Sequence, residues 1–506
     1  MSIFAPANFK KMNRIWTFIR NWTLPLAMLA GVAEYYVFVA LPFGQEVHHL
    51  TYEVVAHYLQ PFLLFIMLFL SFIKVSPKEM RPHWWQLWVL LVQAVCFILC
   101  SFLAMCMPDE GWKVLCEGAM LAFICPTATA SAVVVGKLGG SVSGVVTYLM
   151  MCNLMVSLLA PAFLTLVELN DMGFFIGFLM ILRKVMPLLV CPLLVAWFVR
   201  FCVKGFYRWL IRFNDLAFYV WAVSLSLAIA VTVRSIVHSS VGLWYMIGLA
   251  IISGVGCLLQ FAIGKAIGGY FGPTERITAG QAFGQKNTVF VIWMGQVFLN
   301  PVTSVVGGFY SVWHNTVNSW QLYKKRSSAK SEIRTRMKKK IAEMPLQERE
   351  RQSREVCKKI IVSPEFSKAD NLLLYMALKD EVSLDALVAE ALAQGKTVWL
   401  PVMVGNSLIV KRYEPSAMHV EDRFGISEPG ENAAQLTDLK KIDLAIIPGR
   451  AFTRDGARLG RGKGFYDRML TELCCPMWGV GFRWQMVSRI ETDSWDVKLQ
   501  KVLSAE

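Results

Sequence analysis

One segment near the end of the sequence combines glycine with positive charge in a pattern that suits phosphate. It reads DGARLGRGKGFYDR, residues 455–468, and it follows the apolar stretch DLAIIPGRAF, residues 443–452. The glycines let the backbone approach a ligand closely, and the basic side chains between them supply charge. These residues are Gly460, Gly462 and Gly464 with Arg458, Arg461 and Lys463. The sequence reads as a buried strand, then this loop, then a helix from about Phe465. That order predicts a phosphate-binding loop, and the alternative is a glycine-rich surface turn.

A second set of polar residues lies inside apolar stretches. AFICPTATASAVVVGKLGG places Pro126 among hydroxyl side chains that include Thr129 and Ser131, and TAGQAFGQKNTVFVIW places amides and a lysine together. Interrupted segments of this kind can expose backbone and side-chain oxygens to an ion or a substrate. The candidate transport-site residues are Thr129, Ser131, Gln281, Gln285, Lys286 and Asn287. Packing between membrane helices would explain the small residues equally well, but a cation such as Lys286 is costly there unless it faces a cavity or a partner.

The composition divides the chain into two dissimilar parts. The 506 residues are 55% hydrophobic and 17% charged on average, but long apolar runs end near Trp320 and a strongly basic stretch follows. We expect a membrane domain over 1–323, a basic linker over 324–330, and a domain of soluble character over 331–506, whose first helix begins as early as 329–330. In that last domain, apolar strand candidates, among them NLLLYMAL near 371–378 and TVWLPVMV near 397–404, alternate with helical stretches. This alternation predicts an α/β fold with a mostly parallel sheet.

The membrane part predicts ten spanning segments, since a spanning helix needs about twenty mostly apolar residues. They are 22–43, 53–73, 84–106, 114–135, 142–166, 178–199, 214–233, 243–264, 278–298 and 302–322. With the N-terminus inside, lysine and arginine concentrate in the inside segments, from Lys10, Lys11, Arg14 and Arg20 onward, as the positive-inside rule requires. This arrangement predicts a multi-pass protein of the cell (inner) membrane with both termini and the last domain cytoplasmic. The net charge of +15 is thus explained by topology, and nucleic-acid binding is excluded because no basic and aromatic stripe lies outside those loops.

At CPTATAS, GQKNT and SVWHNTVNSW, residues 20–322 resemble the bile acid:sodium symporter-like transporters. The resemblance implies an all-α polytopic membrane domain with ten spans, inverted repeats and two broken crossing helices. The sequence departs from the sodium-coupled pattern at Ala132, at Gln281 and at Lys286, where the family has an asparagine, a glutamate and an asparagine. Because an ammonium group repels sodium, Lys286 is expected to supply the positive charge itself and to pair with an organic anion.

RLGRGKGFYDR, with PGRAF before it, resembles the 5-formyltetrahydrofolate cyclo-ligase family over residues 330–506. The resemblance implies ATP- and Mg²⁺-dependent conversion of 5-formyltetrahydrofolate to 5,10-methenyltetrahydrofolate. The central FGISEPG motif (424–430) fits the family, whereas Trp495 replaces its common histidine. The implied roles are catalysis by Arg458, Lys463 and Tyr466, substrate binding by Glu381 and Tyr466, and metal binding by Asp467 and Asp496. The implied ATP-binding residues are Lys330, Arg334, Arg458, Gly460, Arg461, Gly462, Lys463, Gly464, Phe465, Tyr466 and Asp467.

The two resemblances together predict a cyclo-ligase fused to a carrier of an organic anion, with folate as one candidate cargo. The partners expected are ATP, 5-formyltetrahydrofolate, the lipid bilayer and an unidentified transported anion. Three alternatives stay open: a cyclo-ligase anchored by a membrane domain that does not transport, a carrier for an unrelated organic anion, and a membrane sensor whose folate domain reports bound ligand without turnover.

Overall fold

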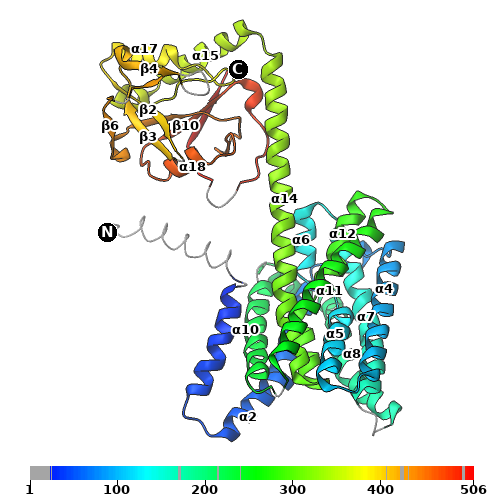
Figure 1. The fold of residues 1–506 in the computed structure, drawn as a ribbon. Coiled ribbons are helices and arrows are strands. Elements are labelled where there is room, and N and C mark those ends of the chain that lie inside the picture. The colour runs from blue at the N-terminus through cyan, green and yellow to red at the C-terminus, as the bar shows by residue number, and fades with distance from the viewer. Residues whose placement is uncertain are drawn as a thin grey trace. The chain divides into compact units, whose positions relative to one another are not determined.

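The chain forms two compact units, Met1–Leu322 and Tyr323–Glu506 (Figure 1). The computed structural model describes residues 23, 25–168, 173–213, 216–239, 241–405, 407–421, 427–430, 432–492 and 496–505. The boundary between the units falls inside one helix, α14 (Val305–Glu343). Residues 324–330, expected as a linker, are therefore helical.

The first unit is helical throughout its described part. After a helix at Pro25–Ala40 come α2 (Gln45–Val54), α3 (Gln60–Phe72), α4 (Trp84–Cys106), α5 (Glu110–Ile124), α6 (Ser131–Leu138), α7 (Val142–Glu168), α8 (Phe174–Cys202), α9 (Lys204–Leu210), α10 (Leu216–Val237), α11 (Leu243–Gly269), α12 (Pro273–Gly284), α13 (Thr288–Phe298) and the first part of α14. Helices α4, α5, α7 and α11 pack side by side, as Figure 1 shows.

Helix α4 illustrates why these segments suit a bilayer. Its inward side buries Trp85, Val89 and Phe97, while Trp88 and Leu99 on its outward side are exposed. A helix that is apolar on every side finds a favourable environment only inside a protein or in lipid. The exposed apolar surface of this unit is therefore of the kind that contacts hydrocarbon.

Six stretches of the described chain are helical, long and apolar enough to cross a membrane. They are Gln45–Phe72, Trp84–Cys106, Val142–Val167, Phe174–Cys202, Leu216–Val237 and Leu243–Gly269. The other four predicted spans do not form a single helix of this length and apolar character. Span one, 22–43, begins at a residue outside the described part of the chain, and Lys10, Lys11, Arg14 and Arg20 also lie outside it. Spans four and nine are each divided into two helices, and span ten carries His314 and Asn318.

The two divided spans meet at their interruptions. Residues 125–130 separate α5 from α6, and residues 285–287 separate α12 from α13. Thr127 and Lys286 form an antiparallel bridge, in which Ala128 N–H donates to Gln285 O (2.8 Å) and Asn287 N–H donates to Pro126 O (2.8 Å). Backbone groups freed by each interruption are thus satisfied by the other, which is the condition for breaking a helix away from water.

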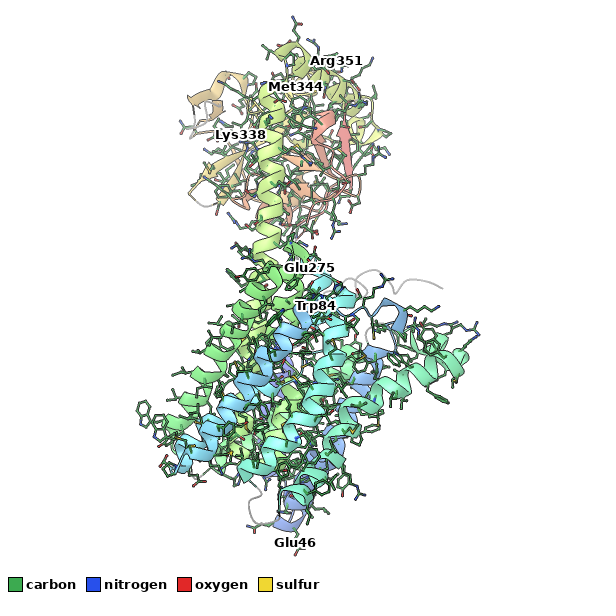
Figure 2. The ribbon with its side chains drawn as sticks, turned by 90° about the vertical axis from the view of Figure 1, so that its right-hand side faces the viewer. Glu46, Trp84, Glu275, Lys338, Met344 and Arg351 are labelled. Atoms are coloured by element: carbon green, nitrogen blue, oxygen red, sulfur yellow. The ribbon has the colours of Figure 1, made fainter. Side chains whose placement is uncertain are left out.

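Landmark residues mark the two ends of the helical unit. Trp84 at the start of α4 and Glu275 in α12 lie at one end, and Glu46 in α2 lies at the other (Figure 2).

The second unit is built on a seven-stranded, mostly parallel sheet, as predicted. Its strand order is β11-β10-β7-β1-β2-β3-β6, with parallel pairing from β11 through β2 and antiparallel pairing for β3 and β6. The strands are β1 (Asn371–Leu373), β2 (Thr397–Val404), β3 (Ser407–Arg412), β6 (Gln435–Leu436), β7 (Leu444–Ile447), β10 (Met477–Gly481) and β11 (Lys501–Ser504). Two small hairpins pair β4 (Met418–Glu421) with β5 (Ser427–Pro429), and β8 (Ala451–Phe452) with β9 (Arg458–Leu459).

Both faces of this sheet are covered. In the central strand β7, Leu444 and Ile446 pack into the core beneath α15 (Leu346–Ile361) and α17 (Asp385–Ala393). Ala445 and Ile447 point the other way, into the core that includes α18 (Phe465–Leu470). The unit also contains the short helix α16 (Pro364–Lys368). An all-apolar strand such as LAII is typical of a parallel sheet buried on both faces.

Candidate functional site

The glycine-rich segment forms a loop between the β8–β9 hairpin and α18. Gly462 and Gly464 have φ angles of 105° and 68°, a region that side chains with a Cβ rarely adopt. The space beside Gly462 is bordered by the guanidinium of Arg334, which lies 3.5 Å from where a Cβ would be. The distance is an ordinary van der Waals contact, so glycine is required at these two positions by the turn and not by lack of space.

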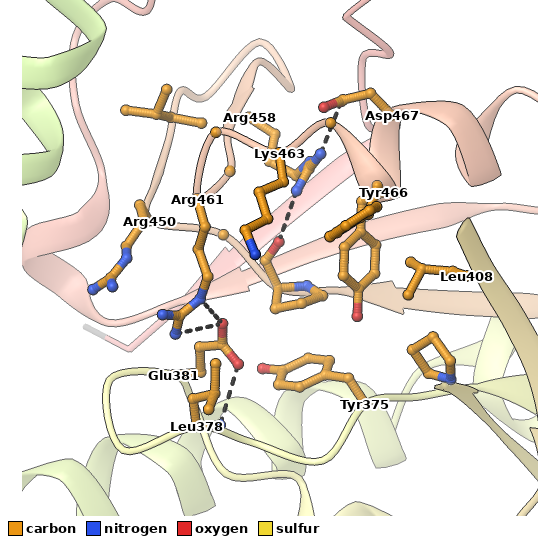
Figure 3. A pocket seen from close by; sticks show the side chains of 18 of the residues that line it. Tyr375, Leu378, Glu381, Leu408, Arg450, Arg458, Arg461, Lys463, Tyr466 and Asp467 are labelled. Atoms are coloured by element: carbon orange, nitrogen blue, oxygen red, sulfur yellow. Dashed lines mark hydrogen bonds and ion pairs between the residues drawn. The ribbon is translucent and has the colours of Figure 1, made fainter. Parts of the chain in front are cut away.

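The loop borders a cavity of about 680 Å³. Its walls come from α14, from the segment after β1, from β2 and β3, and from the loop with the start of α18 (Figure 3). The cavity is lined by every predicted residue of the cyclo-ligase site: Lys330, Arg334, Glu381, Arg458, Gly460, Arg461, Gly462, Lys463, Gly464, Phe465, Tyr466, Asp467 and Asp496. Residues separated by more than a hundred positions thus share one site.

Arg458 is the most deeply buried of the loop's cations, with a side chain only 3% exposed. Its guanidinium donates to Asp467 Oδ1 (2.8 Å) and to the carbonyl oxygen of Pro448 (3.2 Å), and it lies 5.5 Å from the ring centre of Tyr466. Arg458 therefore joins the segment after β7 to the start of α18.

Arg461 is held by carboxylates. Its Nε and Nη2 atoms donate to Glu381 Oε1 at 3.2 and 3.1 Å, and Nη2 also contacts Asp380. Asp380 forms a further ion pair with Arg450. Burial raises the pKa of the Glu381 carboxyl, although the charge of Arg461 acts in the opposite direction. Glu381 is thus a desolvated carboxylate whose charge is stabilised chiefly by one arginine.

Lys463 differs from the two arginines. Its side chain points into the cavity between Arg461 and Tyr466 in the view of Figure 3, and no ion pair joins it to a residue in the described part of the chain. Its amine lies 5.9 Å from the ring centre of Phe465. Lys463 is therefore a cation positioned to meet an anionic ligand.

Helix α14 supplies the wall opposite the sheet. Lys330 Nζ pairs with Asp496 Oδ2 (3.0 Å), and Arg334 Nε donates to the carbonyl oxygen of Gly460 (3.0 Å). Lys330 and Arg334 are four positions apart, so they lie on one face of the helix. Asp467 and Asp496 each have a cationic partner, and among the described residues no group of three or more His, Cys, Asp and Glu side chains could hold a metal. A Mg²⁺ ion here would need phosphate oxygens as additional ligands.

Sequence reasoning missed several cavity residues. Among them are Arg450, three positions after the end of β7, and Tyr375 and Met376, two and three positions after the end of β1. Their position at the carboxyl ends of neighbouring parallel strands is the signal that could have identified them. Residues 424–426 and Trp495 lie outside the described residues.

The polar residues of the first unit gather at the crossing of the two interruptions. Lys286 is 1% exposed, and its Nζ has no hydrogen-bond partner in the described part of the unit, lying 4.7 Å from the ring centre of Phe283. Both side-chain polar atoms of Gln281, Oε1 of Gln285 and Nδ2 of Asn287 also lack partners there.

The hydroxyl residues of span four are less uniform. Ser131 Oγ donates to Ala128 O (2.6 Å), and Thr129 is only partly buried. The sequence reasoning did not single out Thr127, whose hydroxyl donates to Ala282 O (2.6 Å) across the crossing. The structure therefore places the amides and the lysine together, with Thr127 rather than Thr129 against them.

Comparison with known proteins concerns the second unit. The model of the 5-formyltetrahydrofolate cyclo-ligase family matches residues 326–505. The 5-formyltetrahydrofolate cyclo-ligase of Haemophilus influenzae is 32% identical over 181 residues, covering 34% of this chain and 96% of that protein. The enzyme of the same name from Mus musculus is 28% identical over 190 residues, covering 35% of this chain and 94% of its own. An NMR structure of Aquifex aeolicus 5,10-methenyltetrahydrofolate synthetase shares 34% identity with a TM-score of 0.32, and the match covers 34% of this chain and 88% of that one.

Proposed function

Since the chain belongs to the 5-formyltetrahydrofolate cyclo-ligase family through residues 326–505, we propose that the cavity of the second unit binds ATP and 5-formyltetrahydrofolate side by side. The observation that carries this assignment is the shared cavity itself. It joins a glycine-rich, cationic loop to the desolvated carboxylate of Glu381. One end therefore suits phosphate and the other suits a ring that offers N–H donors.

The phosphate end consists of the loop and α14. Lys463, together with the backbone N–H groups of Gly460–Gly464, would bind the terminal phosphates, and Lys330 and Arg334 would contribute charge from the opposite wall. Phosphoryl transfer depends mainly on positioning and on charge stabilisation. Arg458 would act from beneath the loop by fixing its shape.

The folate end consists of Glu381 with the tyrosines around it. Glu381 would accept hydrogen bonds from the pterin, and Tyr375 and Tyr466 would pack beside the ring. Burial raises the pKa of both tyrosines, so their hydroxyls remain protonated at neutral pH. Tyr466 lies between the two ends and can contact either substrate.

The chemistry has two steps. The formyl oxygen attacks the γ-phosphorus of ATP, and ADP leaves. N10 of the folate then bonds to the activated carbon, phosphate departs with the C–O bonding electrons, and the N10 proton is released to give 5,10-methenyltetrahydrofolate. Lys463 and the loop amides would stabilise the charge that develops on the transferred group.

Mg²⁺ would be held at this site by Asp467 or Asp496 together with phosphate oxygens. One or two carboxylates plus phosphates are the ligand set that this hard cation usually takes, so the residues present fit it. When bound, the ion would neutralise phosphate charge.

Lys463→Ala tests the assignment of the phosphate end. We expect a fall in kcat of about a hundredfold, the usual effect of losing one preorganised group at the developing charge. The measurement is ATP-dependent formation of 5,10-methenyltetrahydrofolate by the purified full-length chain. Lys440→Ala, at an exposed position in a surface turn, is the matched control and should retain full activity. Equal activity of both variants would remove Lys463 from the mechanism.

For the first unit we propose a carrier of organic anions built from ten spans with inverted repeats, as in the bile acid:sodium symporter-like family. Support comes from the crossing of two interrupted helices around the buried, unpartnered Lys286. A fixed ammonium at the crossing would replace a bound sodium ion and attract an anion. A folate, anionic through its glutamate tail, is the candidate cargo because released substrate would meet the enzyme nearby.

Uptake of labelled 5-formyltetrahydrofolate into vesicles tests this carrier, with and without a sodium gradient. We expect uptake that is indifferent to sodium and abolished in Lys286→Gln, but retained in Lys204→Gln, which alters an exposed lysine in α9. No uptake by folded protein under either condition would leave a cyclo-ligase anchored by its membrane unit or a carrier for a different anion. With the N-terminus inside, as the positive-inside rule indicates, the enzyme and both termini would lie in the cytoplasm.

A further inference from the structure

Within the cavity, Arg461 is bound by two carboxylates. Its guanidinium donates twice to Glu381 Oε1, at 3.2 and 3.1 Å, and also contacts Asp380. The side chain of Arg461 is 38% exposed, whereas Asp380 is 16% exposed. A partly exposed cation is thus bound to two sheltered carboxylates, which we call the Arg461 clamp (Asp380 and Glu381).

Glu381 cannot hold Arg461 and accept hydrogen bonds from a pterin at both of its oxygens. Oε1 already accepts two N–H groups from Arg461, and Oε2 accepts the backbone N–H of Leu378 (3.2 Å), as Figure 3 shows. A carboxylate oxygen accepts about two hydrogen bonds, so Oε2 can accept one more, whereas Oε1 has no remaining capacity. A pterin that donates to both oxygens must therefore displace Arg461 from Oε1.

Asp380 is positioned differently from Glu381. It contacts Arg461 on one side and Arg450 on the other, but it does not line the cavity. A bound ring therefore reaches Glu381 without reaching Asp380. Once the pterin occupies Glu381, Arg461 keeps only Asp380, which Arg450 already partly neutralises, and the phosphate of ATP becomes the stronger partner.

We propose that folate binding opens the Arg461 clamp, so that Arg461 engages the nucleotide phosphates only when both substrates are bound, with Asp380 as the positioning residue that holds it back until then. This inference rests on the proposed function of the cavity. It assigns Arg461 to the ternary complex, whereas Lys463 serves the nucleotide in either state. ATP would thereby be protected from wasteful transfer to water before the formyl group is in place.

Nucleotide affinity measured with and without folate tests the clamp. The protein is the full-length chain in detergent, and the probes are a non-hydrolysable ATP analogue and 5-formyltetrahydrofolate in isothermal titration calorimetry. In the wild type we expect saturating folate to tighten analogue binding about tenfold, within the usual range for two coupled sites.

Two variants separate the clamp from a simple phosphate contact. Arg461→Ala should abolish the tightening by folate, so that the affinity for the analogue is the same with and without folate. Asp380→Asn should tighten analogue binding several-fold in the absence of folate and reduce the coupling between the two ligands to about twofold or less, sizes that follow from the coupling range above. It should also increase the formation of ADP from ATP in the absence of folate.

Asp438→Asn is the matched control, since it removes one exposed carboxylate and still allows the side chain to accept the N–H of Lys440. It should keep the wild-type coupling. If Asp380→Asn does not fold, as judged by its thermal midpoint, the Arg461→Ala result decides alone. Weakening of analogue binding by Arg461→Ala to the same extent with and without folate would overturn the clamp. Absence of cyclo-ligase turnover in the wild type would instead overturn the proposed function itself.

Discussion

Glu381 is a binding residue whose buried carboxylate lowers the stability of the folded protein when no ligand is bound. Its carboxylate is sheltered from water and relies on Arg461 and one backbone N–H for compensation. Because burial raises its pKa above the ordinary glutamate value, the ionised form is less favourable in the folded protein than in the unfolded chain. The residue that is best prepared for a pterin is therefore a source of instability in the empty enzyme.

Glu381→Gln should weaken folate binding while stabilising the empty protein. Loss of a hydrogen bond to a charged acceptor corresponds to a roughly ten- to hundredfold lower folate affinity. The thermal midpoint of the ligand-free variant should exceed that of the wild type at pH 8. A carboxyl whose folded-state pKa is raised destabilises the fold above that pKa, and this cost disappears as the pH falls through it. The difference in midpoint should therefore close toward pH 5, and a variant less stable than the wild type at pH 8 would contradict this account.

Among the elements, the glycine-rich loop depends on backbone geometry as much as on charge. Gly464 begins α18 with a φ of 68°, and Gly395, which follows α17, has a φ of 72°. The two glycines have the same conformational requirement, but only Gly464 lines the cavity. Comparing alanine substitutions at the two positions therefore separates the backbone strain caused by an added Cβ from its effect on ligand binding.

Gly464→Ala and Gly395→Ala should destabilise the second unit to a similar extent, by about 1–2 kcal/mol, the cost of a left-handed conformation for a residue with a Cβ. Only Gly464→Ala should also weaken binding of the ATP analogue, because relief of the strain moves the loop amides. Chemical unfolding and calorimetry of the two variants provide the comparison. Equal nucleotide affinity in both variants would show that the loop tolerates the shift.

The sequence predicted elements best where a single pattern decides them. The stretch 397–404 is strand β2 (Thr397–Val404), because alternating burial and β-branched residues agree there. The stretch 371–378 is a strand only over Asn371–Leu373, since Tyr375 and Met376 continue the apolar pattern while lining the cavity. An apolar run does not reveal whether its side chains face a core or a ligand.

The ion pairs of the site were beyond sequence reasoning for a related reason. The chemistry of Arg458 and Arg461 was predicted from their neighbours in the loop, but their partners depend on how α18 and the segment after β1 approach that loop. Asp380 had no local pattern to mark it, and Arg450 could have been identified only from its position at the carboxyl end of a parallel strand. The same holds for the bridge between Thr127 and Lys286, which joins two distant segments.

At the scale of the whole molecule, the chain consists of two units with different environments and one shared helix. The first unit exposes apolar surface, and the second buries a sheet on both faces. The chain divides into these units between Leu322 and Tyr323, inside α14. The contrast in composition gave no sign that one helix continues across this division.

Ligand binding should therefore stabilise one unit selectively. We expect two thermal transitions for the purified chain, of which only the one that reports the second unit rises with the ATP analogue. At a hundredfold excess over its Kd, a ligand that binds only the native state stabilises it by about 2.7 kcal/mol. Scanning calorimetry with and without the analogue measures this effect, and an equal rise of both transitions would show that the two units unfold together.

The crossing of the two interrupted helices has a consequence for biosynthesis. The hydroxyl of Thr127 bonds to a carbonyl 155 positions later in the chain, so a ribosome produces the first interruption long before the second. During that interval the N–H of Ala128 and the carbonyl oxygen of Pro126 lack the partners that residues 285–287 supply later. A chain that stops before α12 would thus leave these polar groups unsatisfied, which is costly wherever water is excluded.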